Sequence, residues 1–315
     1  MGVAIGMGLM EYPFTTTAGF WRWVDMCEQS GVDSLWQTDR IISRPPILEC
    51  MTAIAAMAGR TRRLKFGMNV VSLALREPVL LAKQCATIDV LSEGRLLPAF
   101  GIGSPLAPEW EAMGVDTSTR GRRTDEGLEI ISRLWREESV DFVGRHYRLK
   151  DASISPRPVQ PDLPMWIGGS SEAAIRRTAR YGTGWQAGAE TAADTGKIVA
   201  AIKAAAVAAG RRIDDDHYGA AFAFHFGSAG DRGLAPVMEA YAKRTGRNPL
   251  RYFAIGDETT IVERLREYID AGVSKFILRP AARGDEAMLA QTQKLIDRVL
   301  PLVAARWKRV AKPAA

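Results

Sequence analysis

The sequence is poor in cysteine and histidine, with three of each among 315 residues. The cysteines are Cys27, Cys50 and Cys85, and the histidines are His146, His217 and His225. The cysteines form no Cys-x-x-Cys pair, and the histidines show no His-x-x-x-His or mixed His and Cys spacing. We therefore expect neither a disulfide framework nor a catalytic metal. This use of cysteine is typical of a reducing, cytoplasmic compartment.

Long apolar runs are also absent, because nowhere do eighteen apolar residues follow one another and no signal-peptide-like run precedes Glu11. We expect a protein that neither spans a membrane nor is secreted. The charge is only mildly unbalanced, at +6. Residues 306–315 hold four basic residues and no acid, and we predict a basic tail there, following one domain of residues 1–305. The basic residues are not interleaved with aromatic ones along one groove, so nucleic-acid binding is not expected.

Short apolar runs alternate with longer helix-like runs along the whole chain, which is the pattern of βα units around a parallel sheet. The predicted strands are residues 3–9, 34–37, 65–71, 96–102, 165–168, 184–187, 218–226 and 275–278. The predicted helices are residues 17–30, 47–59, 78–91, 122–137, 171–181, 192–209, 234–244 and 285–302. One further helix is predicted to begin at a capping box formed by Thr260 and Glu263, and to end at Gly272.

Eight such strands predict an α/β fold, a single (β/α)8 TIM barrel, with the surplus length in two insertions. After helix 4, residues 140–161 indicate a small hairpin followed by a proline-rich crossing. After strand 7, residues 227–256 hold an additional helix. A doubly wound open sheet is the alternative architecture, although Gly6-Met7-Gly8 lacks the third glycine of its usual dinucleotide turn.

In a barrel of this kind, the C-terminal ends of the strands carry binding and catalysis. Gly168 and Gly169 follow the fifth predicted strand, and Ser170 and Ser171 then open a helix, which suits a phosphate at the positive end of the helix dipole. A plain serine cap explains the same residues equally simply. The glycines of Gly101-Ile102-Gly103-Ser104, after the fourth strand, would let a flat ring approach the backbone.

Charged residues follow two other strands. Asp39 and Arg40 stand side by side after the second strand, and Arg279 follows the eighth. Each could serve an anionic group or developing charge, or form an ordinary ion pair. The sequence contains neither a GxxxxGK[ST] phosphate loop nor a GxSxG nucleophile elbow.

From residue 5 to residue 301 the chain resembles the luciferase-like flavin-dependent monooxygenases. The motifs that carry the resemblance are GVDSLW (31–36), PVLLAKQ (78–84), LSEGRL (91–96), GRRTDE (121–126), PMWIGGS (164–170) and AGV (271–273). The resemblance implies a (β/α)8 barrel that holds reduced FMN in its mouth. The implied cofactor-binding residues are Met68, Asn69, Val70, Gly103, Ser104, Arg122, Gly168, Gly169, Ser170 and Ser171. It also implies a non-proline cis peptide between Asn69 and Val70.

The resemblance leaves the reaction open. The first hypothesis is a monooxygenase that uses reduced FMN and molecular oxygen to oxygenate a small organic substrate, with Asp39, Arg40 and Arg279 as candidate catalytic residues. No nicotinamide fingerprint is present, so a separate flavin reductase is expected to deliver the reduced flavin. The alternatives are hydride transfer with a deazaflavin coenzyme of the F420 type, and a non-catalytic flavin-binding protein. Deazaflavin dehydrogenases of the family tend to have Asp-His where this chain has Asp39-Arg40, and a glutamate where it has Leu106. A homodimer is one arrangement that the sequence leaves open.

Overall fold

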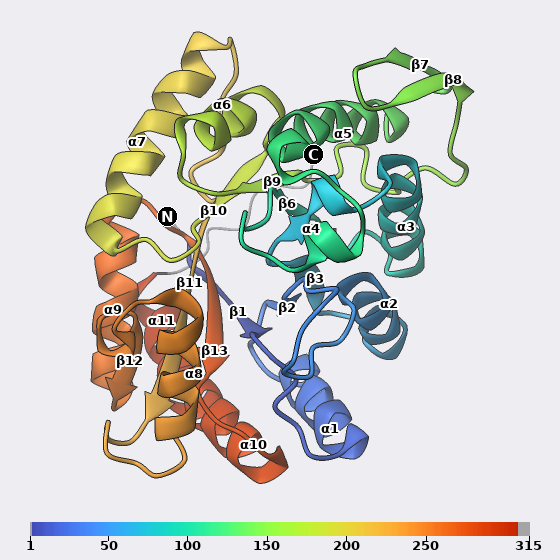
Figure 1. Ribbon diagram of the computed structural model, residues 1–315. Coiled ribbons are helices and arrows are strands. Elements are labelled where there is room, and N and C mark those ends of the chain that lie inside the picture. Colours follow the sequence, from blue (N-terminus) through green and yellow to red (C-terminus); the bar gives the residue numbers. More distant parts are fainter. Residues whose placement is uncertain (1, 308–315) are drawn as a thin grey trace.

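The strands of the computed structural model, which describes residues 2–307, form a closed parallel barrel (Figure 1). The barrel strands are β1 (Ala4–Leu9), β2 (Ser34–Gln37), β3 (Lys65–Met68) with β4 (Val71–Ser72), β5 (Leu96–Leu97) with β6 (Ala99–Gly101), β9 (Trp166–Gly168), β10 (Gly184–Gln186), β11 (Tyr218–Phe226) and β13 (Lys275–Pro280). Their order is β4-β6-β9-β10-β11-β13-β1-β2-β3-β5. Because β3 and β4 form one interrupted barrel strand, and β5 and β6 another, the pairs β3·β5 and β4·β6 close the ring. The predicted TIM barrel is confirmed.

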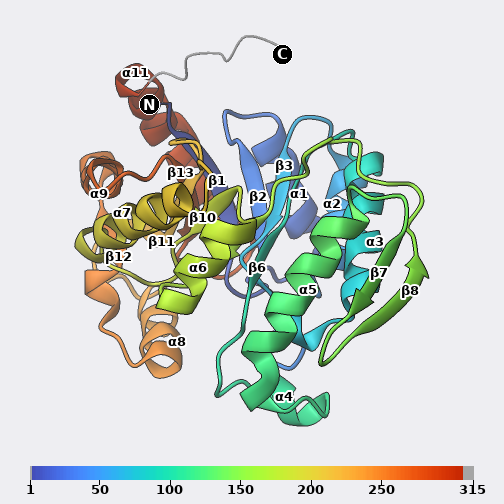
Figure 2. The same cartoon turned by 90° about the horizontal axis from the view of Figure 1, so that it is seen from above.

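Helices surround the barrel on its outside (Figures 1 and 2). They are α1 (Thr17–Glu28), α2 (Cys50–Arg60), α3 (Pro78–Leu91), α4 (Glu109–Ala112), α5 (Arg120–Leu134), α6 (Glu172–Tyr181), α7 (Ala192–Ala208), α8 (Ala235–Thr245), α9 (Glu258–Asp270), α10 (Asp285–Lys294) and α11 (Leu300–Arg306). A π-helical turn, Leu295–Val299, joins α10 to α11. Figure 2 shows α4 and α8 at one end of the barrel and α11 at the other. Within residues 2–307, no helix combines the length and the apolarity needed to cross a membrane.

Local sequence explains how these helices begin and which face they bury. The Thr16 side chain caps α1 by accepting a hydrogen bond from the Gly19 amide, and the helix packs Phe20, Trp23 and other apolar residues into the core. The prediction for α9 was wrong at its start. That helix begins at Glu258, because Asp257 rather than Thr260 is the cap and accepts from the Thr260 amide at 3.0 Å.

Both predicted insertions are confirmed. β7 (Val140–Val143) and β8 (Arg148–Ala152) form an antiparallel hairpin that projects beside α5 and α3 (Figure 1). After β11, the chain forms α8 and then β12 (Phe253–Gly256), which adds to the edge of β11 in parallel. β12 and α4 were not predicted, and the third and fourth barrel strands, which were predicted to be unbroken, are interrupted. Of the predicted tail, residues 308–315 lie outside the described residues.

Two tryptophans fill the barrel interior below its mouth. Trp36 from β2 and Trp166 from β9 are almost fully buried, and their ring centroids lie 6.3 Å apart in an edge-to-face arrangement. Gly67 faces the Trp36 ring, and a Cβ at this position would lie 2.3 Å from it. At the opposite end from the mouth, the ammonium group of Lys275 pairs with the Asp33 carboxylate. The interior is therefore a packed core that closes the barrel beneath its mouth.

Candidate active site at the barrel mouth

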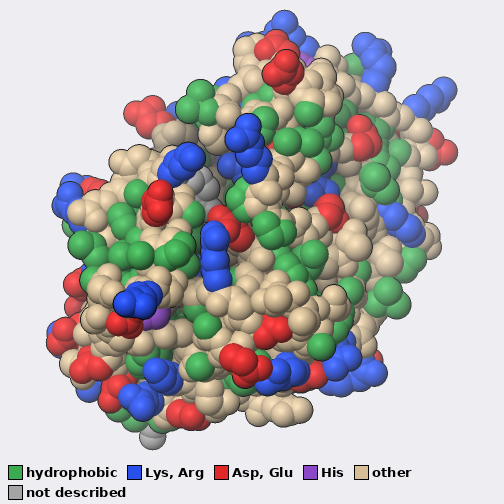
Figure 3. All heavy atoms as spheres, turned by 60° about the horizontal axis from the view of Figure 1, so that its bottom comes forward, with side chains coloured by type: hydrophobic (Ala, Val, Ile, Leu, Met, Phe, Trp, Pro, Cys, Tyr) green, Lys and Arg blue, Asp and Glu red, His purple; other side chains and the backbone are tan. Residues whose placement is uncertain are grey.

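Two adjoining hollows lie at the C-terminal ends of the barrel strands. The central hollow has a volume of about 290 Å³ and is lined by Met10, Thr38, Arg40, Asn69, Val70, Gly168, Gly169, Gln186, Ala187, Gly188 and Arg279. The side hollow, of about 320 Å³, is lined by Asp39, Arg40, Val70, Ser72, Leu75, Gly101, Ile102, Gly103, Ser104, Ala107, Glu109, Gly168 and Gly169. Acidic and basic side chains are mixed over the face in Figure 3, and several basic ones surround a hollow. The structure thus gathers most of the predicted site residues in one place.

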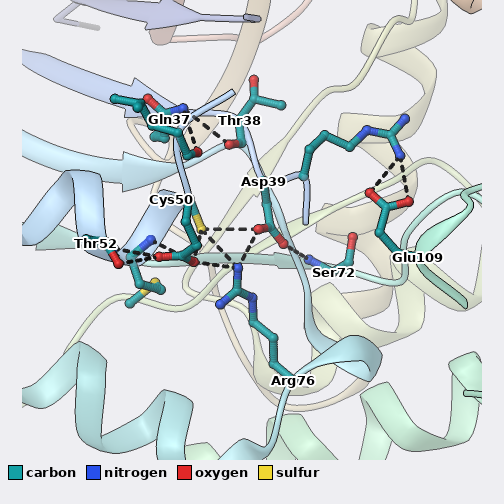
Figure 4. A network of polar contacts seen from close by, with 12 residues as sticks. Gln37, Thr38, Asp39, Cys50, Thr52, Ser72, Arg76 and Glu109 are labelled. Atoms are coloured by element: carbon teal, nitrogen blue, oxygen red, sulfur yellow. Dashed lines mark hydrogen bonds and ion pairs between the residues drawn. The ribbon is translucent and has the colours of Figure 1, made fainter. Parts of the chain in front are cut away.

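Asp39 is the centre of a buried ion-pair network (Figure 4). Its Oδ1 accepts from the Arg76 guanidinium at 2.6 Å, and its Oδ2 accepts from the Ser72 amide at 3.0 Å. The same Arg76 nitrogen lies 2.8 Å from Glu49, and the Cys50 thiol donates to Asp39 at 3.3 Å. Ligand atoms of Asp39, Glu49 and Cys50 all lie within 4.8 Å of one another, but the cation among them is the Arg76 guanidinium. This geometry gives Asp39 a positioning role for the β4 side of the mouth.

The thiol of Cys50 is held in its neutral form. Burial and the facing Asp39 carboxylate raise its pKa well above the ordinary value. A neutral thiol donates a hydrogen bond and is a poor nucleophile. Cys50 therefore supports the Asp39 network rather than acting as a reactive group.

Arg40 forms a second ion pair at the rim of both hollows. Its guanidinium lies 3.2 Å from each carboxylate oxygen of Glu109, which α4 contributes (Figure 4). The Glu109 side chain is only 3% exposed, whereas that of Arg40 is 32% exposed. The pair neutralises a charge that would otherwise stand alone in a nearly dry environment.

The glycine turn after β9 contributes to both hollows. A Cβ at Gly168 would lie 3.1 Å from the Val70 side chain, so glycine keeps this wall flat. Ser171 caps α6, because its hydroxyl accepts a hydrogen bond from the Ala174 amide at 3.3 Å. This supports the interpretation of Ser171 as an ordinary helix cap. Ser170 is exposed beside it. The predicted phosphate site stays a prediction.

Four predicted residues line neither hollow, namely Met68, Arg122, Ser170 and Ser171. Met68 is fully buried in the main core, and Arg122 is exposed on α5. Neither lines a hollow at the mouth. The arginine that is buried near the start of α5 is not Arg122 but Arg177, which α6 contributes. Its guanidinium pairs with Asp125 at 2.6 Å. Arg279 lies at the end of β13 and lines the central hollow.

Two amide side chains line the central hollow, and each has one buried polar atom without a hydrogen-bond partner among the described residues. The Nδ2 atom of Asn69 and the Oε1 atom of Gln186 have no hydrogen-bond partner among the described residues. The Nε2 atom of Gln186 donates to the Ala187 carbonyl at 3.3 Å. The peptide bond between Asn69 and Val70 is cis, as predicted. A buried polar atom without a partner costs stability, so a donor and an acceptor kept at a hollow point to a ligand.

Several residues of this site were not predicted from the sequence. Arg76 and Glu109 are the partners of Asp39 and Arg40, and Gln186 and Thr38 line the central hollow. The only local signal for Gln186 was its place at the end of a predicted strand. No local signal could have paired Arg76 with Asp39, because the two are brought together by the closure of the barrel.

Comparisons with known proteins agree with this architecture. The family model described as luciferase-like monooxygenase matches residues 7–249. An uncharacterised protein of Mycobacterium tuberculosis is 35% identical over 159 residues, which cover 50% of this chain and 54% of that protein. The chain thus spans about half the length of that relative. An F420-dependent glucose-6-phosphate dehydrogenase of Amycolatopsis mediterranei is 26% identical over 303 residues, covering 84% of this chain and 89% of that protein.

Two solved structures share the fold at low sequence identity. The monooxygenase RslO1 from Streptomyces bottropensis superposes with a TM-score of 0.81 at 20% identity, covering 95% of this chain and 99% of that chain. An F420-dependent secondary alcohol dehydrogenase also gives 0.81, at 15% identity and the same coverage. At such identities these similarities show the fold alone.

Proposed function

The chain belongs to the luciferase-like monooxygenase family of oxidoreductases, and from this membership we propose that it is a flavin-dependent monooxygenase. In this proposal it uses reduced FMN and molecular oxygen to oxygenate a small organic substrate, and a separate reductase supplies the reduced flavin. The observation that carries the proposal is the central hollow, with a flat wall at Gly168 and two unmatched amide atoms.

The residues at the mouth fit a flat ring with a polar edge. Gly168 and Val70 form a wall that a side chain at position 168 would disrupt, and a planar ring needs such a surface. A flavin ring carries donors and acceptors along one edge, which would match the amide groups of Asn69 and Gln186. The Gly168–Ser171 turn, at the start of α6, would take the phosphate.

Reduced FMN, when bound, supplies two electrons that, with two protons, convert one atom of O2 to water while the other atom enters the substrate. The protein's own residues hold and enclose the reactants. Asp39 and Arg76 fix the Ser72 amide and with it the wall beside Val70. The Arg40–Glu109 pair keeps the rim close to neutral, and Arg279 lies where it can orient a polar group of the substrate.

Hydride transfer to or from F420 is the second candidate. It is favoured by the curated relatives, which include F420-dependent glucose-6-phosphate dehydrogenases at 26% identity over most of the chain. Oxidation of an alcohol, however, needs a group that accepts the hydroxyl proton. The only carboxylates among the described residues that line the two hollows are Asp39 and Glu109, and each is paired with an arginine. This pairing favours monooxygenation over alcohol dehydrogenation.

Anaerobic titration of the purified protein with reduced FMN and, separately, with reduced F420 tests the proposal. We expect saturable binding of reduced FMN, followed by oxygen uptake that depends on the bound flavin. The Gly168→Val variant should lose this binding, because its side chain would collide with Val70 at the wall. Binding of F420 with no affinity for FMN would replace the proposal with the second candidate, and binding of neither would overturn both.

A further inference from the structure

The insertion after β11 is joined to the barrel by two glycine-containing stems and a small apolar cluster. It leaves β11 at Gly227 and returns at Gly256, where the Gly227 amide donates to the Gly256 carbonyl at 3.0 Å. Between the stems, α8 packs on a cluster that is separate from the main core, with the buried members Ala223, Leu234, Tyr241, Phe253 and Ala281. The insertion is therefore anchored apart from the main core, and polar contacts at its stem add to a small apolar anchor.

His225 lies at this stem, near the end of β11, with its side chain only 9% exposed. Its Nδ1 atom is 3.1 Å from the Ala281 carbonyl oxygen, and its Nε2 atom is 3.0 Å from Oδ2 of Asp231. A carbonyl and an ionised carboxylate only accept hydrogen bonds, whereas a neutral imidazole carries a single N–H. Both contacts are therefore hydrogen bonds only when the His225 ring is an imidazolium ion.

Asp231 is held in place for this contact. Its Oδ1 atom accepts from the Ser228 hydroxyl at 2.8 Å, and its Oδ2 atom accepts from the Ser228 amide at 3.1 Å. Gly227 has a φ of +148°, and a Cβ at this position would collide with the Asp231 carboxylate. Hydrogen bonds from His225 and Ser228 lower the pKa of Asp231, so the carboxylate stays ionised over the range in which imidazole titrates.

The other ionisable groups on the elements around the ring keep one charge near neutral pH. β12 places the uncharged Ile255 opposite His225. The charged side chains on the loop after β11, on α8, on β13 and at the start of α10 are the cations Arg232, Lys243, Arg279 and Arg283 and the carboxylates Glu239, Asp285 and Glu286. Carboxylates ordinarily ionise near pH 4, and lysine and arginine lose their charge only above pH 10. Within this set, His225 is therefore the group whose charge changes between about pH 5.5 and 8.5.

We propose that His225 and Asp231 form a pH-sensitive clamp on the insertion. With the imidazolium ion, both contacts are hydrogen bonds and residues 227–256 stay fastened to the end of β13. When the pH rises and the ring releases one proton to solvent, one of the two contacts loses its hydrogen atom and the insertion opens more often. Because α8 lies at the same end of the barrel as α4, the clamp regulates the approach to the mouth (Figure 2). The clamp does not depend on which reaction the protein catalyses.

Hydrogen exchange of the full chain, followed by mass spectrometry between about pH 5.5 and 8.5, tests the clamp. After correction for the intrinsic pH dependence of amide exchange, protection of peptides from residues 228–250 should fall about five- to tenfold across this range. Peptides from α5, which makes no contact with the insertion, should keep their protection. The chain has three histidines, so the ring nitrogens can be resolved by NMR. We expect two ring N–H groups on His225 at the acidic end of the range and one at the basic end.

Two variants make the test sharper. His225→Gln removes the titrating ring and should make the protection of the insertion independent of pH. Asp231→Asn supplies an amide that can donate to Nε2 of a neutral ring, so the loss of protection at high pH should disappear. The matched control is His217→Gln, because Nδ1 of His217 also faces a carbonyl, that of Thr183 at 2.8 Å, but its Nε2 lies 3.8 Å from Asp216. This control should behave as the unmodified protein does, and circular dichroism checks that each variant is folded.

The outcomes separate this inference from the proposed function. A pH dependence that survives in His225→Gln, or that affects the α5 peptides equally, overturns the clamp. A His225 ring with an unchanged number of N–H groups across the range overturns it as well. If His225→Gln does not fold, Asp231→Asn decides, because a pH dependence unchanged in that variant contradicts the clamp. A protein that shows the clamp and binds no flavin supports this inference and overturns the proposed function alone.

Discussion

The two sides of the barrel mouth are built in different ways. On one side, β11, β13 and β1 pair continuously, and the residues beyond them pack against α8. On the other side, the third and fourth barrel strands are each interrupted, and the mouth is held by the ion pairs Arg76–Asp39 and Arg40–Glu109. Polar networks thus replace backbone pairing where the strands are interrupted. The flat wall of the proposed ring site lies on this broken side.

The largest expected effect comes from removing the cation of the broken side. Arg76→Met leaves the Asp39 carboxylate buried, with a side chain only 2% exposed and no guanidinium partner. We expect the free energy of unfolding to fall by about 3–5 kcal/mol, as measured by urea denaturation.

The matched control for this variant is Arg60→Ala, which breaks an equally short pair with Asp25 at the surface. Both of those side chains are more than a third exposed, so the loss should be much smaller than that of Arg76→Met. Equal losses in the two variants would mean that burial of the Asp39 network contributes nothing to the broken side.

An intermediate effect is expected at Gln186, where the two sides of the mouth meet. Gln186→Leu removes the unmatched Oε1 atom, so the free energy of unfolding should change by less than about 1 kcal/mol, while affinity for reduced FMN falls about two- to tenfold. The control is Gln160→Leu, because Gln160 donates to Asp89 and to the Leu96 carbonyl away from the mouth. That variant should lose stability and keep its flavin affinity. The reverse pattern would remove Gln186 from the ring site.

The smallest effect concerns acid stability. Burial raises the pKa of Glu49, but hydrogen bonds from Thr52 and Arg76 outweigh it and lower the pKa to about 2 from an ordinary value of 4.5. A carboxyl with a lowered pKa in the folded state stabilises the protein above pH 4.5, and this contribution is lost as the pH falls towards 2. Glu49→Gln should therefore flatten the acid limb of a melting-temperature profile between those values. The change should stay under about 1 kcal/mol, because the side chain is 40% exposed. A parallel shift at every pH would contradict the assignment.

The sequence predicted the continuous side of the barrel better than the broken side. On the continuous side, the bounds of β11 match their prediction and those of β1 differ from it by one residue, since each is a largely apolar run that is almost wholly buried. The interruption between β5 and β6 falls at Pro98, which lacks the N–H that a strand pair needs, so a local signal was present there. At α9, Asp257 and Thr260 were both acceptable caps, and sequence alone could not rank them.

Residues of the site could be predicted from the sequence mainly where they stand at the end of a strand. Arg40, Gly168 and Arg279 were found because each stands at the end of a predicted strand, and Asn69 was found through the family resemblance. The structure gathers all four around the central hollow. Their partners are set by tertiary packing. Glu109, for example, reaches Arg40 across 69 positions of the chain, from a helix too short to be read from periodicity.

The tryptophan pair inside the barrel has a consequence for kinetics. Trp36 and Trp166 close the interior below the mouth, so the central hollow is reached from the C-terminal ends of the strands and not through the barrel. In the proposed reaction, a product must therefore leave the central hollow before the next substrate can bind there.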